Sequence, residues 1–198
     1  HSTYLTNSNI SDVVFVVVEN PRETLARCAA LWFEQQPAKI VAVTGTNGKT
    51  SVASFCQQIW SNLDIEAVSI GTNGVRGAWT QPLRHTTPDA LEMHQLLFNL
   101  KEYGIDHVAL EASSHGLYQS RLDGVQFSGA CFTNFSQDHL DYHKSKDDYF
   151  EAKALLFRQL LTSDKTAVFN VNNNRIKLLA EELKSVSYTH LRAHETRT

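Results

Sequence analysis

The stretch Ile40-Val41-Ala42-Val43-Thr44-Gly45-Thr46-Asn47-Gly48-Lys49-Thr50-Ser51 decides the fold of this chain. Its apolar beginning predicts a short buried strand at 40–44. Apolar residues then recur every three or four positions, which predicts a helix from about 50 to 63. Between the strand and the helix, Gly48-Lys49-Thr50 is the second half of a phosphate-binding loop. The apolar face of the helix would be formed by Val52, Phe55, Cys56, Ile59, Trp60 and Leu63.

The residue types of this turn suit a nucleoside triphosphate. Gly45 and Gly48 allow the backbone to curl so that its N–H groups point at phosphate oxygens, and the start of the helix adds to the attraction. Lys49 would reach the β- and γ-phosphates, and the Thr50 hydroxyl would bind Mg²⁺. The common G-x-x-x-x-G-K-[ST] spacing is not met, because Val43 stands five residues before Gly48. The alternative interpretation is a strand–turn–helix corner with an incidental lysine.

The composition of the whole chain argues against several classes of protein. Its 198 residues suit one domain of good size, or one domain with additional pieces. A net charge of −3 gives no electrostatic reason to expect nucleic acid as a partner. No apolar run approaches the roughly 20 residues that span a membrane, so we expect no membrane association. Cys28, Cys56 and Cys131 lie far apart in apolar stretches, which predicts core thiols and a reducing, cytoplasmic location.

Strands and helices alternate after residue 40. Further strands are expected at 67–70, 107–110, 129–132 and 167–170, and further helices at 88–103 and 148–161. Strands separated by helices of this length indicate βαβ crossovers. The predicted fold is therefore α/β, with a mostly parallel sheet flanked by helices. Ligands of such sheets bind beyond the carboxyl ends of the strands.

The segment before residue 39 holds too little to form a domain alone. A strand is expected at 13–18, and a helix is expected to begin at Pro21, a favourable residue for a first turn. We interpret residues 1–38 as the remnant of a preceding domain and a linker. The chain does not begin with Met, which fits a start inside a longer protein. The expected apolar face of this helix consists of Leu25, Cys28, Ala29, Trp32 and Phe33.

Polar residues follow two of the later strands. Glu111 comes directly after the strand at 107–110, where an acid beside a phosphate loop would organise Mg²⁺; the alternative is a solvated loop acid. Residues 133–143, which follow the strand at 129–132, include Asp138, His139, Asp141 and His143. Most of these residues suit caps and turns. One of them is expected to be a metal ligand, and their spacing does not say which.

Lys153 lies in the helix expected at 148–161, on or beside an apolar stripe. An unpaired ammonium group is costly in such a position. Two interpretations are open: the side chain reaches water past its apolar neighbours, or it is modified or paired in a site. The stripe consists of Tyr149, Leu156, Phe157 and Leu160.

Taken together, these segments resemble the Mur ligase family, the ATP-dependent ligases of peptidoglycan synthesis. The short phosphate loop is the family's own form. The resemblance implies a P-loop NTPase-like central domain at 39–184 and covers residues from about 12 to 184. The tail at 185–198 resembles translated adaptor sequence and is left out of the predicted fold. The matching segments are 44–50, 85–88, 111–117 with Gln119 and Arg121, Asn134 with 138–143, and 149–157.

The resemblance also implies the roles of individual residues. ATP would be bound by Gly45, Thr46, Asn47, Gly48, Lys49, Thr50, Ser51 and Asn134. Mg²⁺ would be bound by Thr50, Glu111, His139 and a carbamylated Lys153. The catalytic residues would be Lys49, Lys153 and His139. The acceptor substrate, a UDP-N-acetylmuramoyl-dipeptide, would be contacted by Thr86, Thr87, Ser113, Gln119 and Arg121. Carbamylation would turn the buried cation of Lys153 into an anion that helps to bind Mg²⁺.

The implied reaction joins a third amino acid to the nucleotide-linked dipeptide through an acyl phosphate. Phosphorylation supplies the leaving group that a carboxylate lacks at neutral pH. The resemblance leaves the identity of the amino acid open and implies a monomer. Two alternatives are a related ligase that adds glutamate to folate and a truncated, non-catalytic Mg·ATP-binding module. The segment 113–117, followed by Gln119 and Arg121, argues against the folate ligase.

Overall fold

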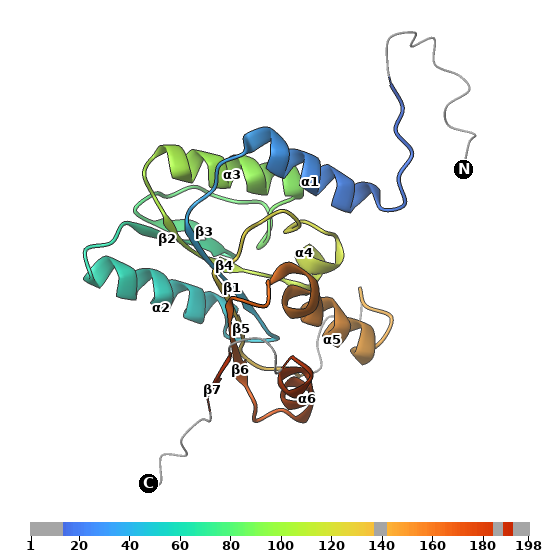
Figure 1. The fold of residues 1–198 in the computed structure, drawn as a ribbon. Coiled ribbons are helices and arrows are strands. Elements are labelled where there is room, and N and C mark those ends of the chain that lie inside the picture. The colour runs from blue at the N-terminus through green and yellow to red at the C-terminus, as the bar shows by residue number, and fades with distance from the viewer. Residues whose placement is uncertain (1–13, 137–141, 184–187, 192–198) are drawn as a thin grey trace.

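A computed structural model describes residues 14–136, 142–183 and 188–191. These residues form a seven-stranded sheet in the order β3-β2-β4-β1-β5-β6-β7 (Figure 1). The β2–β3 pair is antiparallel and every other pair is parallel, so the expected mostly parallel sheet is confirmed. The strands are β1 Lys39–Thr44, β2 Ala67–Gly71, β3 Gly74–Gly77, β4 His107–Glu111, β5 Gly129–Phe132, β6 Thr166–Asn170 and β7 Tyr188–Leu191.

Five of the described helices begin at a residue whose side chain satisfies one of the first N–H groups. The side chains of Asn20, Asp89, Ser113, Ser145 and Asn173 each accept from a backbone N–H group two or three residues further on. A short π-helical segment, η1, continues α5. The helices are α1 Pro21–Phe33, α2 Lys49–Asn62, α3 Ala90–Glu102, α4 Ser114–Tyr118, α5 Lys146–Leu155, η1 Leu156–Leu160 and α6 Asn174–Glu182.

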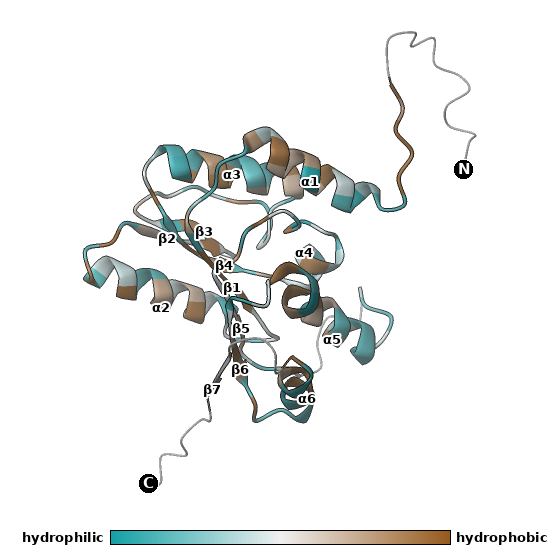
Figure 2. Cartoon of the chain, viewed as in Figure 1, coloured by the Kyte–Doolittle hydropathy of each residue, from teal (hydrophilic) through white to brown (hydrophobic). Residues whose placement is uncertain are grey.

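Strand β1 divides the core into two parts because its side chains alternate between the faces of the sheet. Ile40 and Ala42 belong to the larger cluster, which also contains residues of α3, α5 and α6. Val43 belongs to the smaller cluster on the opposite face, against Ala53 of α2. Figure 2 shows mixed hydrophilic and hydrophobic colouring along α2, α3 and α5, as expected for helices with one face on a sheet.

The register of the parallel strands brings three chain segments to one edge of the sheet. Val43 lies opposite Glu111, and Thr44 lies opposite Phe132. On the other side of β4, Ile70 of β2 lies opposite Leu110. The phosphate loop after β1, the polar end of β4 and the turn after β2 therefore emerge together.

Two parts of the sequence-based prediction for the N-terminal segment are wrong. Residues 14–18 form no strand, because no described strand lies beside them to complete a ladder, and Val14 and Val17 are 87% and 88% exposed. This apolar stretch leads away from the sheet (Figure 2). Helix α1 forms as expected, but it packs against α3 through Ala26 and Ala29, and Trp32 is 83% exposed.

The predicted apolar face of α2 is also partly wrong. Phe55, Ile59 and Leu63 are exposed, whereas the small Ala53 is buried against the sheet. Helical periodicity identifies an apolar arc but not which half of a wide arc meets the sheet, and a small residue permits the closer approach. Cys28 is exposed as well, which corrects the expectation that all three cysteines lie in the core.

Four elements, β3, α4, α6 and β7, were not predicted from the sequence. The segment after β2 forms an antiparallel hairpin with β3, in which Gly74 adopts a φ of +80°, rather than an open loop. Helix α4 is too short for a clear apolar period, whereas Ile176, Leu179 and Ala180 of α6 recur at helical spacing and were overlooked. Residues 188–191, within the tail left out of the predicted fold, pair with β6 as strand β7.

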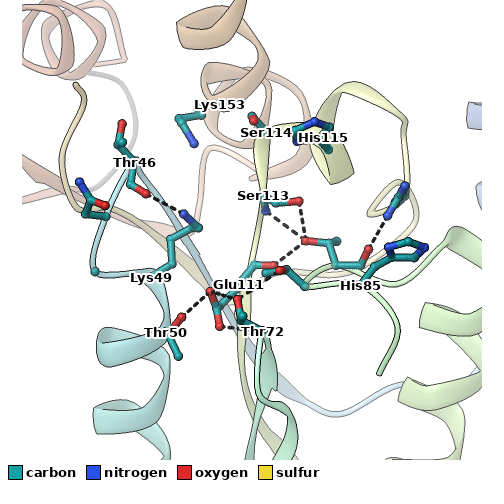
Figure 3. Close-up of a pocket in the computed structure, with 15 residues that line it drawn as sticks. Thr46, Lys49, Thr50, Thr72, His85, Glu111, Ser113, Ser114, His115 and Lys153 are labelled. Carbon is teal, nitrogen blue, oxygen red and sulfur yellow. Dashed lines mark hydrogen bonds between the residues drawn. The ribbon is translucent and has the colours of Figure 1, made fainter. Parts of the chain in front are cut away.

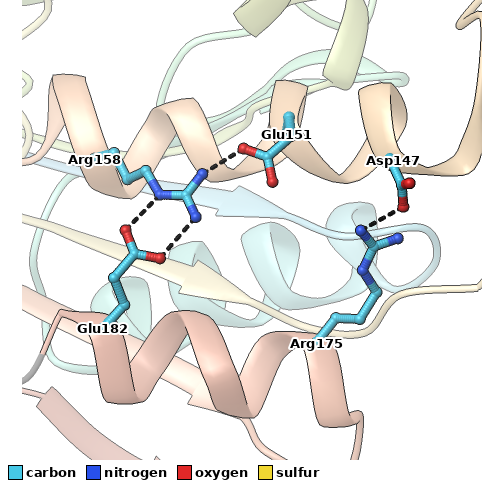
Figure 4. A network of polar contacts seen from close by, with 5 residues as sticks. All are labelled: Asp147, Glu151, Arg158, Arg175 and Glu182. Atoms are coloured by element: carbon cyan, nitrogen blue, oxygen red, sulfur yellow. Dashed lines mark hydrogen bonds and ion pairs between the residues drawn. The ribbon is translucent and has the colours of Figure 1, made fainter.

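A charged network ties α6 to α5 and η1 (Figure 4). The guanidinium of Arg158 makes two hydrogen bonds of 2.7 Å to the carboxylate of Glu182 and also pairs with Glu151. Arg175 pairs with Asp147 at 2.6 Å. These pairs are partly exposed, so each contributes modestly to stability.

Among the described residues, no helix is long and apolar enough to cross a membrane.

Candidate active site

The phosphate loop takes a conformation that its two glycines permit. Gly45 has a φ of +145° and Gly48 a φ of +82°, values that L side chains rarely adopt. An added Cβ at Gly45 would also lie 3.1 Å from the Asn134 backbone nitrogen and closer still to the Thr133 hydroxyl. The loop therefore runs tightly against the end of β5.

Residues after β5 hold this loop in place. The Asn134 side chain makes two hydrogen bonds of 2.9 Å with Asn47: its oxygen accepts from the backbone N–H group and its amide donates to the carbonyl. The Asn134 carbonyl accepts from the Thr46 N–H group, and the Thr133 hydroxyl donates to the Asn47 carbonyl at 2.7 Å. The N–H groups of Thr46 and Asn47 are thus already engaged. Phosphates would meet the N–H groups that follow, at the start of α2, where Gly48 is the N-cap residue.

Two lysines converge on the inner side of the loop. Lys49 Nζ donates to the carbonyls of Gly45 and Thr46, at 3.0 and 2.9 Å. Lys153 Nζ donates to the same Gly45 carbonyl at 2.9 Å and lies 4.4 Å from the centre of the Tyr149 ring. Lys153 is 1% exposed, so it does not reach water as the simpler interpretation supposed. The cation of Lys49 makes this side of the pocket attractive to a triphosphate.

Glu111 is a buried carboxylate at the floor of the same pocket (Figure 3). Its Oε2 accepts from the Thr50 hydroxyl at 2.9 Å, and its Oε1 accepts from the Thr72 N–H group at 2.9 Å. The interpretation of Glu111 as a solvated loop acid is therefore wrong. A carboxylate and a hydroxyl oxygen side by side, next to a phosphate loop, are donors that suit Mg²⁺.

The opposite wall contains most of the residues predicted to contact the acceptor substrate. The Thr87 hydroxyl lies 2.8 Å from the Glu111 carbonyl and 3.0 Å from Ser113 Oγ. Arg121 donates to the Thr87 carbonyl at 2.7 Å and, through two nitrogens, to Gln119 Oε1. Arg121 is thereby held with its guanidinium beside the cavity, as a group that could meet a carboxylate or a phosphate.

One pocket joins these groups. Its volume is about 610 Å³, within the usual range for a small-molecule site. It contains most of the predicted site residues, but Gly45, Ser51, Gln119 and Asn134 do not line it. The residues that line it are Thr46, Asn47, Gly48, Lys49, Thr50, Thr72, His85, Thr86, Thr87, Glu111, Ser113, Ser114, His115, Arg121 and Lys153.

The candidate metal ligands at 138–143 lie only partly within the described residues. His139, predicted as a metal ligand and catalytic residue, lies outside the described residues, as do Asp138 and Asp141. His143 is buried, and its Nε2 lies 3.0 Å from the Ser114 hydroxyl. Within the described ranges, no group of three or more His, Cys, Asp or Glu residues is placed to hold a metal ion. Sequence reasoning missed Thr72, although its place in a glycine-flanked turn after a buried strand was a usable signal.

These features define the class of protein. The Mur ligase middle domain matches residues 43–196, more than half of the chain, and the chain belongs to the Mur ligase family. It is 47% identical over 167 residues to a UDP-N-acetylmuramoyl-L-alanyl-D-glutamate–2,6-diaminopimelate ligase of Bradyrhizobium diazoefficiens. The match covers 82% of this chain and 34% of that protein. The ligase of the same name from Rickettsia bellii is 42% identical, with 85% and 36% covered.

Solved structures agree with this assignment. A structure of a UDP-N-acetylmuramoyl-L-alanyl-D-glutamate–2,6-diaminopimelate ligase aligns with a TM-score of 0.80 and 31% identity, covering 92% of this chain and 38% of that one. FolC of E. coli in complex with DHPP and ADP aligns with a TM-score of 0.64 and 19% identity, covering 95% and 50%. The second likeness shows the shared fold alone. The chain spans about a third of the length of the curated relatives that it matches.

Proposed function

We propose that this chain is the ATP-binding central part of a ligase that adds an amino acid to a UDP-N-acetylmuramoyl-dipeptide. One observation carries the proposal: the phosphate loop, the acid Glu111 and the guanidinium of Arg121 line a single pocket. A triphosphate on the loop and an acidic acceptor on the opposite wall would then meet across Glu111. That geometry suits transfer of a phosphoryl group to a carboxylate.

The reaction would proceed in two balanced steps. An oxygen of the acceptor carboxylate attacks the γ-phosphorus of ATP, the bond to the bridging oxygen breaks, and ADP leaves. The amine then attacks the carbonyl carbon of the acyl phosphate, loses a proton and expels inorganic phosphate. Lys49 would leave the loop carbonyls to stabilise the charge on the transferring group.

The residues present fit a divalent cation. Mg²⁺, held by Thr50 and Glu111, would neutralise phosphate charge. Lys153 is proposed to be carbamylated. A buried ammonium group beside the second cation of Lys49 is costly, and a carbamate would remove that charge and supply an oxygen ligand for Mg²⁺. His139 remains a proposed ligand and catalytic residue. Gly45, Ser51 and Asn134 do not line the pocket, so their part in nucleotide binding would be to shape the loop and the start of α2.

The relatives favour 2,6-diaminopimelate as the incoming amine, because that amino acid is in the names of proteins 42–49% identical to this chain. We propose a cytoplasmic location, since a UDP-linked substrate and ATP would both have to reach the pocket. The domain boundaries at 38 and 184 and the monomeric state also stay proposals. The contact of α1 with α3 favours counting that helix with the central domain.

The test uses the full-length ligase and the 198-residue chain in parallel. Full-length enzyme should release ADP only when the UDP-muramoyl-dipeptide and diaminopimelate are both supplied. The chain alone should bind a fluorescent ATP analogue in a Mg²⁺-dependent manner with little or no turnover. ADP release by the full-length enzyme with a folate substrate, and none with the muramoyl-dipeptide, would contradict the proposal. Nucleotide binding by the chain that does not respond to Mg²⁺ would contradict the assignment of the cation site.

A further inference from the structure

Thr72 contacts both Glu111, at the floor of the pocket, and Thr86, on the acceptor wall. It is the first residue after β2, in the turn that leads to β3. Its backbone N–H group donates to Glu111 Oε1 at 2.9 Å. Its hydroxyl lies 3.4 Å from Glu111 Oε2 (Figure 3). The same hydroxyl lies 3.1 Å from the hydroxyl of Thr86. Among the described residues, Thr72 therefore connects the hydroxyl of Thr86 to the carboxylate of Glu111, while Thr87 contacts only the Glu111 backbone carbonyl.

The single proton of the Thr72 hydroxyl decides the direction of this chain of hydrogen bonds. An ionised carboxylate can only accept, and a hydrogen bond to a charged acceptor is stronger than one to a neutral hydroxyl. Thr72 therefore donates to Glu111 and accepts from Thr86. Thr50 donates to the same carboxylate from the other side, at 2.9 Å. Glu111 is held between the phosphate loop and the β2–β3 turn.

The neighbouring backbone makes this arrangement tight. An added Cβ at Gly71 would lie 2.6 Å from Glu111 Cγ and nearer still to its carboxylate. Glu111 thus packs against the bare backbone of β2 and has little freedom to change rotamer. Thr72 is placed to select the orientation of its carboxylate within that space.

We propose that Thr72 is a positioning residue that orients Glu111 for the divalent cation and couples the cation site to Thr86 on the acceptor wall. The inference rests on the proposed function, since it gives Glu111 the task of binding the cation. It adds a residue that neither the sequence motifs nor the resemblance singled out. The consequence is that a substitution at Thr86 changes the affinity for the divalent cation, and that this effect depends on Thr72.

The test measures Mn²⁺ affinity rather than catalysis. Mn²⁺ is titrated into the 198-residue chain with saturating ADP, and free Mn²⁺ is followed by electron paramagnetic resonance. Thr72→Val keeps the shape and the N–H group but removes the hydroxyl, and Thr72→Ser restores it. Thr166→Val, at the opposite end of the sheet in the exposed start of β6, is the matched control. Circular dichroism checks that each variant is folded.

We expect Thr72→Val to weaken Mn²⁺ binding about three- to tenfold, and Thr72→Ser and Thr166→Val to stay within about twofold of the parent. Thr86→Val should weaken it about twofold in the parent and have no further effect in the Thr72→Val background. Equal affinity in Thr72→Val, or a Thr86→Val effect that persists in that background, overturns the inference alone. If Thr72→Val does not fold, Thr72→Ser decides the test. A folded Thr72→Ser variant that no longer binds Mn²⁺ also overturns the inference. No Mn²⁺ binding by the parent chain with ADP overturns the proposed function together with the inference.

Discussion

The sharpest test of the site is the substitution Gly71→Ala. Gly71 lies in β2 with a φ outside the left-handed region, so an alanine there meets no backbone strain. The added methyl group would lie 2.6 Å from Glu111 Cγ. Non-bonded carbon atoms sit about 3.5–4.0 Å apart, so Glu111 must move by roughly 1 Å or more. That shift breaks or lengthens its hydrogen bonds from Thr50 and from the Thr72 N–H group.

The magnitude follows from those two hydrogen bonds. Each has a length of 2.9 Å and a charged acceptor, and such bonds contribute about 1.5–3 kcal/mol. Allowing for partial relaxation, Gly71→Ala should lower the free energy of unfolding by about 2–4 kcal/mol. For a chain of this size the Tm should fall by roughly 5–15 °C. Divalent-cation affinity in the presence of ADP should fall with it, because the carboxylate no longer lies beside Thr50.

A matched control separates local packing from a general effect of replacing glycine. Gly104 has a φ of +80° and nothing within 4 Å of an added Cβ, and it lies in the turn after α3. Gly104→Ala should cost about 1–2 kcal/mol through backbone strain and leave cation affinity unchanged. Thermal denaturation followed by circular dichroism and the Mn²⁺ titration measure both quantities. A Gly71→Ala variant with parental Tm and parental affinity would refute the placement of Glu111 against β2.

Three further predictions address other parts of the molecule. In the full-length enzyme, Lys153→Ala should lower ligation about 100-fold or more, and short carboxylic acids should partly restore it; unchanged activity would exclude the carbamate. Desolvation lowers the pKa of the buried His94 below its ordinary value of 6.5, so its contribution to stability is fully present above pH 6.5 and declines as the pH falls through and below that value. His94→Gln should flatten the dependence of Tm on pH between pH 7 and 5, and an unaltered slope would contradict this assignment. Arg158→Leu should cost about 1 kcal/mol at low salt and less in 1 M NaCl, as judged by urea denaturation; a loss that does not depend on salt would show that packing dominates.

Local sequence patterns predicted much of this fold. The apolar run at 40–43 and the following glycines predicted β1, the loop and α2, because a buried strand, a tight turn and a helix start each have local requirements. The strands at 107–110 and 129–132 were predicted within one residue for the same reason. Glu111 was identified as a candidate from its position after a buried strand.

Local patterns failed where a partner elsewhere in the chain decides the outcome. Residues 14–18 have strong strand propensity but no described neighbouring strand, so they form no strand, and residues 14–17 are exposed. The exposed Phe55 and Ile59 show that periodicity does not fix which part of an apolar arc meets the sheet. The hairpin at β3 depends on pairing with β2. The turn residues permit this pairing but do not by themselves predict it.

The sequence by itself determined the family, the phosphate loop and the alternation of strands and helices, because these depend on neighbouring residues and on fixed motifs. Only the tertiary structure decided which side chains share the pocket. The parallel register brings the ends of β1, β2, β4 and β5 to one edge, and only then does Thr72 meet Glu111 and Asn134 meet Asn47. Those contacts join residues 39 and 87 positions apart. No local pattern carries information across such separations, since the contacts follow from strand order, which the packing of the whole sheet sets.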